Sequence, residues 1–153
     1  MYVIEHSGVN GCRCKTCSKD SDCCPTLKKQ PFPYKFDKHN RAVLRLQRVG
    51  KIYECGDLCS CGPDCVNRAS QKPKEMPLCL FKTSNRGWGV KAVTNIPKGS
   101  FILEYVGELI GQAEANARAE TAYLFDLNFD SRKDNRFFTI DAFKYGNLSR
   151  FVN

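Results

Sequence analysis

The residues with the clearest capacity for chemistry are ten cysteines, nine of which fall within the first 65 residues. Their spacing is C-x-C-x2-C-x5-C-C, then a gap of 30 residues, then C-x3-C-x-C-x3-C. Zinc binds four thiolates in a tetrahedron, so this crowding favours a thiolate metal cluster. The predicted metal ligands are Cys12, Cys14, Cys17, Cys23, Cys24, Cys55, Cys59, Cys61 and Cys65.

The cysteine spacing allows more than one kind of metal cluster. Two separate four-cysteine sites would leave one sulfur spare. Three zinc ions fit nine sulfurs if six are terminal and three bridge, because each zinc ion needs four bonds. An iron–sulfur cluster uses the same ligand type, but the spacing matches no ferredoxin pattern. Fully ligated sites leave no open position for water, so we expect the metal to be structural.

A disulfide framework is the alternative to metal binding. It requires an oxidising compartment, and the first residues have neither the basic start nor the apolar core of a secretory signal. Adjacent Cys23 and Cys24 are poor partners for each other, although each could pair with a distant cysteine. His6 and His39 lie outside the cysteine runs and are interpreted as surface residues. Cys79 lies in an apolar stretch and is predicted to be a buried strand residue.

A second set of chemistry-bearing residues lies in the other half of the chain. Arg86-Gly87-Trp88-Gly89 forms a G-x-G turn that leads into a strand, and alone it is typical of a simple hairpin. Four further motifs follow in order: Glu104–Glu108, Tyr123–Leu127, Thr139–Ala142 and Tyr145–Asn153.

Taken in this order and spacing, the motifs closely resemble the SET domain of protein lysine methyltransferases. The nine-cysteine segment resembles the pre-SET domain, in which nine cysteines hold three zinc ions. The pair resembles the suppressor-of-variegation class, which methylates lysine 9 of histone H3. The resemblance extends from about Tyr2 to Asn153.

The resemblance implies a cofactor, a reaction and site residues. Arg86, Gly87 and Trp88 would line S-adenosylmethionine. Tyr123 would lie beside the cofactor and line the lysine channel, as the candidate catalytic residue, and Asn153 would bind the cofactor. A methyl group would pass to a neutral lysine amine by in-line displacement. Desolvation in an aromatic channel would lower the pKa of that amine, and alignment of the reacting atoms would supply much of the rate.

The family motif at the end of this sequence continues, in relatives, past Asn153 with His, Ser and Cys. A late catalytic tyrosine and a cysteine-rich post-SET tail follow there. The chain is therefore expected to be a fragment of the enzyme, inactive alone, whereas a longer form would transfer methyl groups. The alternative function is a non-catalytic zinc-binding module that acts in chromatin through its partners.

Strand-like runs and turn residues indicate the elements that position these motifs. We expect a mostly β fold with few helices: a pre-SET zinc-cluster domain at 1–68, a linker at 69–77 and an incomplete SET β-fold at 78–153. One helix is expected from about Gln112 to Glu120. The expected strands are Ala42–Leu46, Leu78–Lys82, Trp88–Val93, Phe101–Val106, Tyr123–Phe129 and Phe137–Ile140.

The formal net charge of the 153 residues is +8. Nine thiolates with three Zn²⁺ ions add −3 and lower it to +5, which weakens charge as an argument for DNA binding. One group of basic residues could contact DNA non-specifically or be a solvated face. It comprises Lys28, Lys29, Lys35, Lys38, Arg41, Arg45, Arg48 and Lys51.

The partners implied by the resemblance are the histone H3 tail and chromatin proteins. The implied location is the nucleus, in heterochromatin, with centromeres as one candidate site. No membrane partner is expected, because no apolar run approaches the roughly 20 residues that a membrane helix needs.

Overall fold

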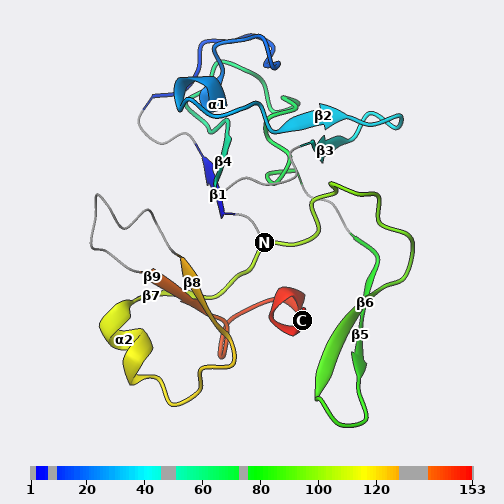
Figure 1. Cartoon of the computed structure of the whole chain (residues 1–153), viewed down its shortest axis with the longest axis vertical. Coiled ribbons are helices and arrows are strands. Elements are labelled where there is room, and N and C mark those ends of the chain that lie inside the picture. The colour runs from blue at the N-terminus through cyan, green and yellow to red at the C-terminus, as the bar shows by residue number, and fades with distance from the viewer. Residues whose placement is uncertain (1–2, 7–9, 46–50, 73–75, 128–137, 153) are drawn as a thin grey trace. The chain divides into compact units, whose positions relative to one another are not determined.

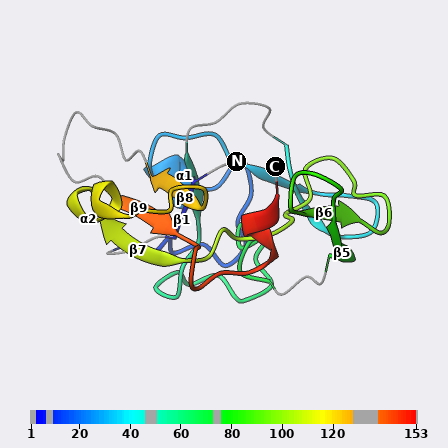
Figure 2. The same ribbon diagram turned by 90° about the horizontal axis from the view of Figure 1, so that it is seen from below.

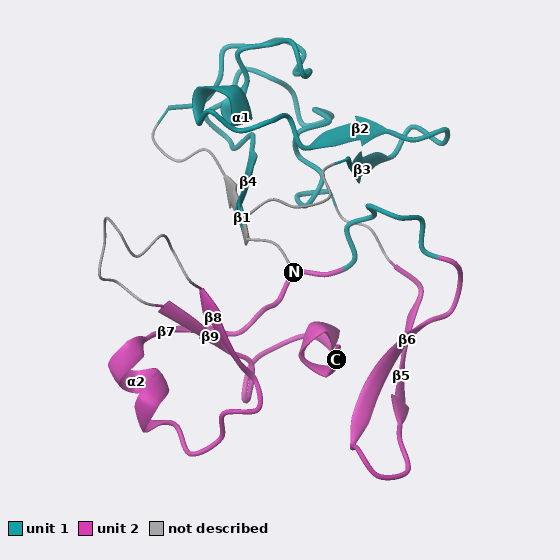
Figure 3. Cartoon of the chain, in the orientation of Figure 1, with its two compact units in different colours: residues 1–75, 96–102 teal, residues 76–95, 103–153 magenta. Residues whose placement is uncertain are grey.

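The computed structural model describes residues 3–6, 10–45, 51–72, 76–127 and 138–152 (Figure 1). The chain divides into two compact units (Figure 3). The first, here called the cysteine unit, comprises residues 1–75 and 96–102. The second, here called the strand unit, comprises residues 76–95 and 103–153. The chain therefore leaves the cysteine unit, returns to it for seven residues and leaves again.

The described residues of the cysteine unit form two small sheets and one helical turn. Strand β1 (Val3–His6) pairs in parallel with β4 (Lys51–Glu54), and β2 (Tyr34–Phe36) pairs antiparallel with β3 (Ala42–Leu44). Helix α1 (Cys24–Leu27) begins directly after Cys23, with a proline in its first turn, where the missing N–H costs nothing. Strand β3 confirms the predicted strand at its start, whereas β1, β2 and β4 were not predicted.

Sulfur forms much of the core of the cysteine unit. Seven of the thirteen buried residues in its core cluster are cysteines, and the other six are Phe32, Tyr34, Ala42, Ile52, Val66 and Ala69. So few hydrocarbon groups cannot supply the stability of a conventional core. The buried cysteines are Cys12, Cys17, Cys23, Cys24, Cys55, Cys59 and Cys61.

The returning segment, residues 96–102, meets β3 at Gly99. The backbone N–H of Leu44 donates to the carbonyl oxygen of Gly99 over 2.7 Å. Gly99 has a φ of +88°, and a Cβ placed on it would lie 2.4 Å from the Leu44 carbonyl oxygen. Only glycine satisfies both the backbone conformation and the close approach.

Two antiparallel sheets form the strand unit. A hairpin pairs β5 (Leu78–Lys82) with β6 (Trp88–Ala92). The second sheet places β9 (Phe138–Asp141) between β7 (Glu108–Gly111) and β8 (Leu124–Leu127). These elements confirm the mostly β fold.

Two helical segments accompany the strands. Helix α2 (Gln112–Ala117) follows β7 directly and contacts both β7 and β9 (Figure 2). A 3₁₀ turn, η1 (Leu148–Phe151), contacts β6. The helix ends three residues before the predicted Glu120, because Arg118 adopts an extended backbone with a ψ of 131°.

The predicted strand at Phe101–Val106 is wrong. Its side chains do alternate between half-buried and exposed, as in a strand, but no ladder partner is present among the described residues. The carbonyl of Glu104 accepts instead from the side chain of Asn147 over 3.0 Å. The strand of this region begins after Gly107, at Glu108.

Cys79 lies on β5 as predicted but is only half-buried, because a two-stranded hairpin covers little of either face. At the ends of the predicted strands, residues 128–129 and 137 lie outside the described residues. Their described parts are confirmed as β8 and β9, except that β8 begins one residue later than predicted, at Leu124, because Tyr123 lies in a turn.

Candidate metal centre and cofactor site

The nine clustered cysteines come together in space from two stretches of sequence. The first stretch supplies Cys12 to Cys24, around α1, and the second supplies Cys55 to Cys65, which follow β4. All ten cysteines are described by the structure, and none forms a disulfide.

Distances between sulfur atoms test which kind of cluster the residues fit. Cys12 lies 3.8 Å from Cys17 and 3.9 Å from Cys55, and Cys17 lies 3.7 Å from Cys55. A disulfide would require about 2.05 Å. Zinc–sulfur bonds of about 2.3 Å place the sulfurs of a tetrahedron about 3.8 Å apart. The spacing is therefore that of thiolates around a shared metal ion.

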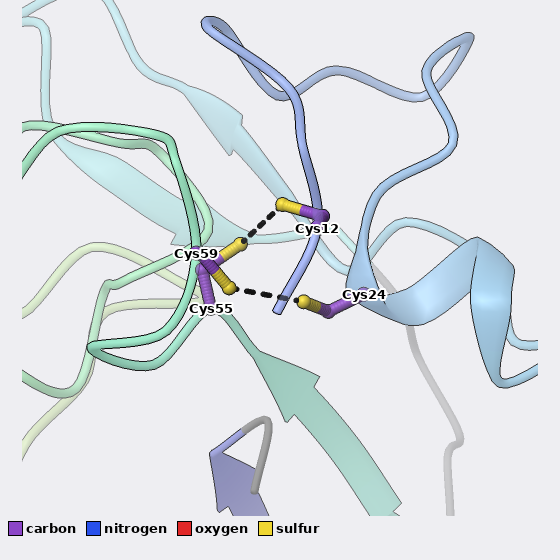
Figure 4. A group of neighbouring side chains, drawn as sticks. All are labelled: Cys12, Cys24, Cys55 and Cys59. Atoms are coloured by element: carbon purple, nitrogen blue, oxygen red, sulfur yellow. Dashed lines mark hydrogen bonds between the residues drawn. The ribbon is translucent and has the colours of Figure 1, made fainter. Parts of the chain in front are cut away.

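Two groups of four sulfurs have all their members within 4.8 Å of one another. One group is Cys12, Cys24, Cys55 and Cys59, whose side chains converge in Figure 4. In this group the sulfurs of Cys24 and Cys59 lie 3.4 Å apart. The other group is Cys12, Cys17, Cys55 and Cys61. Cys12 and Cys55 belong to both groups, as bridging sulfurs would, so the two groups are not independent four-cysteine sites.

The remaining cysteines join the same cluster. The Cys23 sulfur lies 3.5 Å from that of Cys55. Cys14, which is half-buried, interacts with the thiols of Cys12 and Cys17. Cys65, also half-buried, interacts with Cys17 and Cys55. The structure thus brings together all nine predicted ligands.

Burial controls how easily these thiols ionise. Burial raises the pKa of Cys17, because a thiolate loses hydration there. Burial also opposes ionisation of Cys12, but hydrogen bonds outweigh it and lower the pKa of Cys12 to about 6. Those bonds come from the Cys14 backbone and from neighbouring thiols. Protonated neighbours can stabilise one thiolate in this way, but nine adjacent thiolates require cations among them.

Two polar residues beside the sulfurs were missed by the sequence analysis. Asn67 is fully buried, and its side-chain N–H donates to the Cys55 sulfur over 3.3 Å. Arg68 is 9% exposed and donates to the carbonyl oxygen of Gly56 over 2.7 Å. Burial raises the pKa of the Cys61 thiol, and the Arg68 guanidinium opposes that rise. The sequence signal that could have pointed to them is their position, two and three residues after Cys65.

A buried carboxylate holds β4 beside the cluster. Glu54 accepts from the Tyr34 hydroxyl over 2.6 Å, from the Ser70 backbone and hydroxyl over 2.9 and 2.8 Å, and from the Gln71 amide over 2.8 Å. Ala69, the neighbour of Ser70, is 1% exposed. The first residues of the predicted linker 69–77 therefore pack into the cysteine unit.

The turn at Arg86 to Trp88 closes the β5–β6 hairpin. Thr83 caps it, since its hydroxyl donates to the Gly87 carbonyl over 2.9 Å and accepts from the Arg86 N–H over 2.9 Å. Gly87 has a φ of +74°, which favours glycine. Arg86 and Trp88 are exposed, and the indole of Trp88 is therefore available to a ligand.

Tyr123 lies in an aromatic group with a cation on its face. The Arg150 guanidinium lies 4.1 Å from the centre of the Tyr123 ring. The rings of Phe143 and Phe151 lie 6.2 and 6.4 Å from it. The Tyr105 hydroxyl fixes the backbone by donating to the Tyr123 carbonyl over 2.8 Å. Rings and a guanidinium of this kind form a surface that excludes water and stabilises stacked groups.

The two parts of the predicted cofactor site are connected through η1. Strand β6, which begins at Trp88, contacts η1, and η1 carries Arg150 and Phe151. Asn147 precedes η1 and accepts from the Ser149 N–H over 2.9 Å. The remaining predicted residue, Asn153, lies outside the described residues.

Comparison with known protein families supports this arrangement. The family model of the pre-SET motif matches residues 1–68, and that of the SET domain matches residues 87–153. The order of the two matches is the order of the cysteine cluster and the Arg86 turn along the chain. A pre-SET module, with a sulfur cluster suited to metal ions, followed by SET sequence is thus the class that the fold and site define.

Relatives and solved structures identify the class more closely. Histone-lysine N-methyltransferase SUV39H2 of Gallus gallus is 45% identical over 99% of the chain, which spans 39% of that relative. Su(var)3-9 of Drosophila melanogaster is 40% identical over 96% of the chain, which spans 24% of it. One solved structure, from work on product specificity of histone lysine methyltransferases, is 30% identical with a TM-score of 0.80. It covers 99% of the chain, which covers 70% of it.

Two further solved relatives hold ligands. Arabidopsis thaliana SUVH6 in complex with SAM is 35% identical, with a TM-score of 0.76, over 99% of this chain and 36% of its own. KRYPTONITE in complex with DNA, an H3(1-15) peptide and SAH is 35% identical, with a TM-score of 0.75, over 99% of this chain and 31% of its own. This chain belongs to the pre-SET and SET family of histone lysine methyltransferases, in the class of Su(var)3-9 and SUV39H2.

Proposed function

We propose that this chain is part of an enzyme that transfers a methyl group from S-adenosylmethionine to lysine 9 of histone H3. The observation that carries the proposal is a nine-sulfur cluster followed by the Arg86 turn and the Tyr123 aromatic group in a single chain. Solved histone lysine methyltransferases share this fold over 99% of the chain.

The cysteine cluster is proposed to bind three zinc ions. Cys12 and Cys55, which occur in both sulfur groups, would be two of the three bridging ligands. The domain bounds proposed are 1–68 for the zinc domain and 78–153 for the SET part, joined by 69–77. The zinc ions would have a structural role, because each sulfur group already offers four ligands to its ion.

The cofactor is proposed to bind along Arg86, Gly87 and Trp88, beside Tyr123 and Asn153. The cofactor supplies the methyl group, and this chain supplies the surroundings. The exposed indole of Trp88 and the backbone at Gly87 would contact the ligand. The ring of Tyr123 would line the lysine channel and keep water out. A dry channel lowers the pKa of the lysine amine, which must be neutral to attack.

The partner proposed is the histone H3 tail in nuclear heterochromatin, including centromeric chromatin. KRYPTONITE, a solved relative, holds an H3 peptide and DNA. Non-specific DNA contact by this chain would use exposed basic residues of the cysteine unit, such as Lys28, Lys29 and Lys38. Among the described residues no helix is both long and apolar enough to cross a membrane.

A methyl-transfer assay tests the proposed function. The chain is assayed alone and joined, after Asn153, to the corresponding carboxyl-terminal part of the chicken relative, with radiolabelled cofactor and H3 peptide. The joined protein is expected to label the peptide but not a peptide with arginine in place of lysine 9. Labelling of both peptides would refute the lysine 9 assignment. Binding of zinc without any methyl transfer would favour the non-catalytic chromatin module instead.

Site variants test the proposed residues in the same assay. Tyr123→Ala is expected to lower the rate on the order of 100-fold, because a misplaced substrate loses alignment. Trp88→Ala is expected to weaken cofactor binding measured by calorimetry. Lys144→Ala, at an exposed position of the same unit, is the matched control and should retain both properties. Unchanged rates in Tyr123→Ala would remove that residue from the site.

A further inference from the structure

Asn67 is held inside the cysteine unit by contacts with sulfur. Its side chain is fully buried, and its Nδ2 lies 3.3 Å from the Cys55 sulfur and 3.7 Å from the Cys23 sulfur. The Asn67 backbone N–H donates to the Cys65 sulfur over 3.3 Å, and its carbonyl accepts from the Cys55 N–H over 2.9 Å. One residue therefore contacts three of the nine candidate ligands.

The orientation of the Asn67 amide follows from the chemistry around it. Its Nδ2 also donates to the carbonyl oxygen of Tyr53 over 3.2 Å, so every side-chain contact uses the donor. Its Oδ1 is buried and, within the described part of the chain, has no hydrogen-bond partner. Turning the amide over would place this oxygen against another carbonyl and two sulfurs, all electron-rich. The Asn67 side chain therefore acts as a hydrogen-bond donor to sulfur, and its amide oxygen is left without a donor.

Arg68 presents a buried positive charge to the same cluster. Its Nη2 donates to the carbonyl oxygens of Gly56 and Cys61 over 2.7 and 3.4 Å, so the guanidinium is fastened to the loop that carries Cys59 and Cys61. Its charge acts on the thiols of Cys61, Cys55 and Cys59. Among the described residues its carboxylate contact is with Asp57, at 3.8 Å, and that side chain is fully exposed, so the pair contributes little.

The charge of the cluster explains why a buried guanidinium is tolerated there. Nine thiolates and three Zn²⁺ ions carry a net charge of −3. An isolated buried cation is costly, whereas a cation beside an anionic cluster is paired. An amide N–H directed at sulfur acts in the same sense, because it withdraws electron density from the thiolate.

We propose that Asn67 and Arg68 are positioning residues of the metal cluster, which set its metal affinity and the reactivity of its sulfurs. Asn67 orients Cys55, the candidate bridging ligand, and Cys23. Arg68 offsets the negative charge around Cys61. The proposal rests on the proposed zinc cluster. Residues that hold metal ligands in this way typically change metal affinity 10- to 100-fold when replaced.

Metal competition with matched variants tests the proposal in the whole chain. Zinc affinity is measured against a chromophoric chelator, and the thiolate-to-cobalt charge-transfer band is recorded after cobalt replaces zinc. Asn67→Asp has nearly the same shape but no donor. We expect it to lower zinc affinity at least about tenfold and to shift the cobalt band to lower energy. Tyr34→Phe, which loosens the Glu54 contacts without touching a sulfur, should leave the band in place.

Arg68 variants separate charge from packing. Arg68→Met keeps the hydrocarbon part of the side chain and is expected to lower zinc affinity and to speed reaction of the sulfurs with N-ethylmaleimide. Arg68→Lys restores the charge and should recover most of both properties. Equal behaviour of the Met and Lys variants would refute the electrostatic role.

Where Asn67→Asp prevents folding, Asn67→Ser, which keeps a shorter donor, is expected to give a smaller shift of the cobalt band. A folded Asn67→Ser or Asn67→Asp chain with wild-type affinity and spectrum would overturn the role of Asn67. Failure of the wild-type chain to bind zinc or cobalt would instead overturn the proposed metal cluster, and this inference with it.

Discussion

Each of the two units of this chain is stabilised in a different way. Seven cysteines, a glutamate, an asparagine and an arginine are buried in the cysteine unit. The cysteines, which are the candidate metal ligands, make up more than half of its core cluster. The strand unit is built on hydrogen-bonded sheets, and its buried apolar side chains among the described residues are Ile110, Ala115 and Ala142. Larger apolar side chains of that unit, such as Trp88 and Leu109, are exposed. If the sulfur cluster binds the proposed zinc ions, metal takes the place of hydrocarbon in the core of the cysteine unit and not in that of the strand unit.

Removing metal is the strongest test of the difference between the two units. Chelation at neutral pH should unfold the cysteine unit, because structural zinc contributes about 10 kcal/mol or more per ion to folding. Amide NMR signals of residues 10–45 and 51–72 should collapse, while those of the β5–β6 hairpin change less. Acid should act in the same direction, since protons compete with zinc for thiolates. Equal collapse of both units would show that they do not differ in this way.

Replacing single cysteines should show how many zinc ions depend on each sulfur of the cysteine unit. Cys55→Ser removes a sulfur that belongs to both groups of four, so we expect it to lose more than one zinc ion. Cys14→Ser removes a half-buried sulfur at the edge and should lose at most one. Native mass spectrometry gives the zinc content of each variant. Cys79→Ser, on β5, is the control and should keep the full complement.

The buried hydrogen bonds around Glu54 should contribute less to the free energy of unfolding than the sulfur cluster does. Tyr34→Phe removes a hydrogen bond of 2.6 Å to a buried carboxylate and should cost about 1.5–3 kcal/mol of unfolding free energy. Burial, followed by the Glu54 charge, raises the pKa of Tyr34. Its contribution to stability is therefore complete below the unfolded-state pKa of about 10 and is lost as the pH rises above it. Alkaline unfolding followed by circular dichroism should be less steep in the Phe variant.

An ion-pair cluster provides the corresponding test in the strand unit. Arg118 contacts Glu114 at 2.7 Å, Asp141 at 3.4 Å and Glu108 at 3.7 Å, and so ties α2 to the sheet. Arg118→Ala leaves the buried Asp141 without this partner and should cost about 1–2 kcal/mol. The loss should be the same with and without chelator, because no metal ligand is involved. Chelator-dependent melting of this variant would contradict the separation of the two units.

The sequence singled out nine cysteines that the structure brings together, and their role as metal ligands stays a prediction. It predicted less of the fold around them. Spacing identified the nine sulfurs because thiolate coordination requires many cysteines close together. The same reasoning missed Asn67 and Arg68, since an amide or a guanidinium near a cysteine has many ordinary uses. Strands β5 and β6 were found through their apolar runs and the glycine turn between them. Short strands such as β2 carry too few residues for a period to emerge.

The predicted strand at Phe101–Val106 was wrong for a different reason. Alternation of half-buried and exposed side chains is present, but alternation indicates an extended backbone and not a partner strand. The side chain of Asn147, 43 residues away, supplies the hydrogen bond that a neighbouring strand would have given Glu104. Cys79 was misjudged for a related reason, because the covering of a strand depends on elements that its own residues do not specify.

The return of residues 96–102 to the cysteine unit has a consequence for the hairpin between them. The chain leaves the cysteine unit at residue 76 and returns to it at residue 96, so both ends of the β5–β6 hairpin are joined to a unit that we propose folds around metal-bound thiolates. Closing a loop restricts the conformations open to the chain inside it. Oxidation of the sulfurs would therefore release one closed loop carrying Arg86, Gly87 and Trp88. Through this tether the redox state of the thiols would bear on how well those residues are preorganised for a ligand.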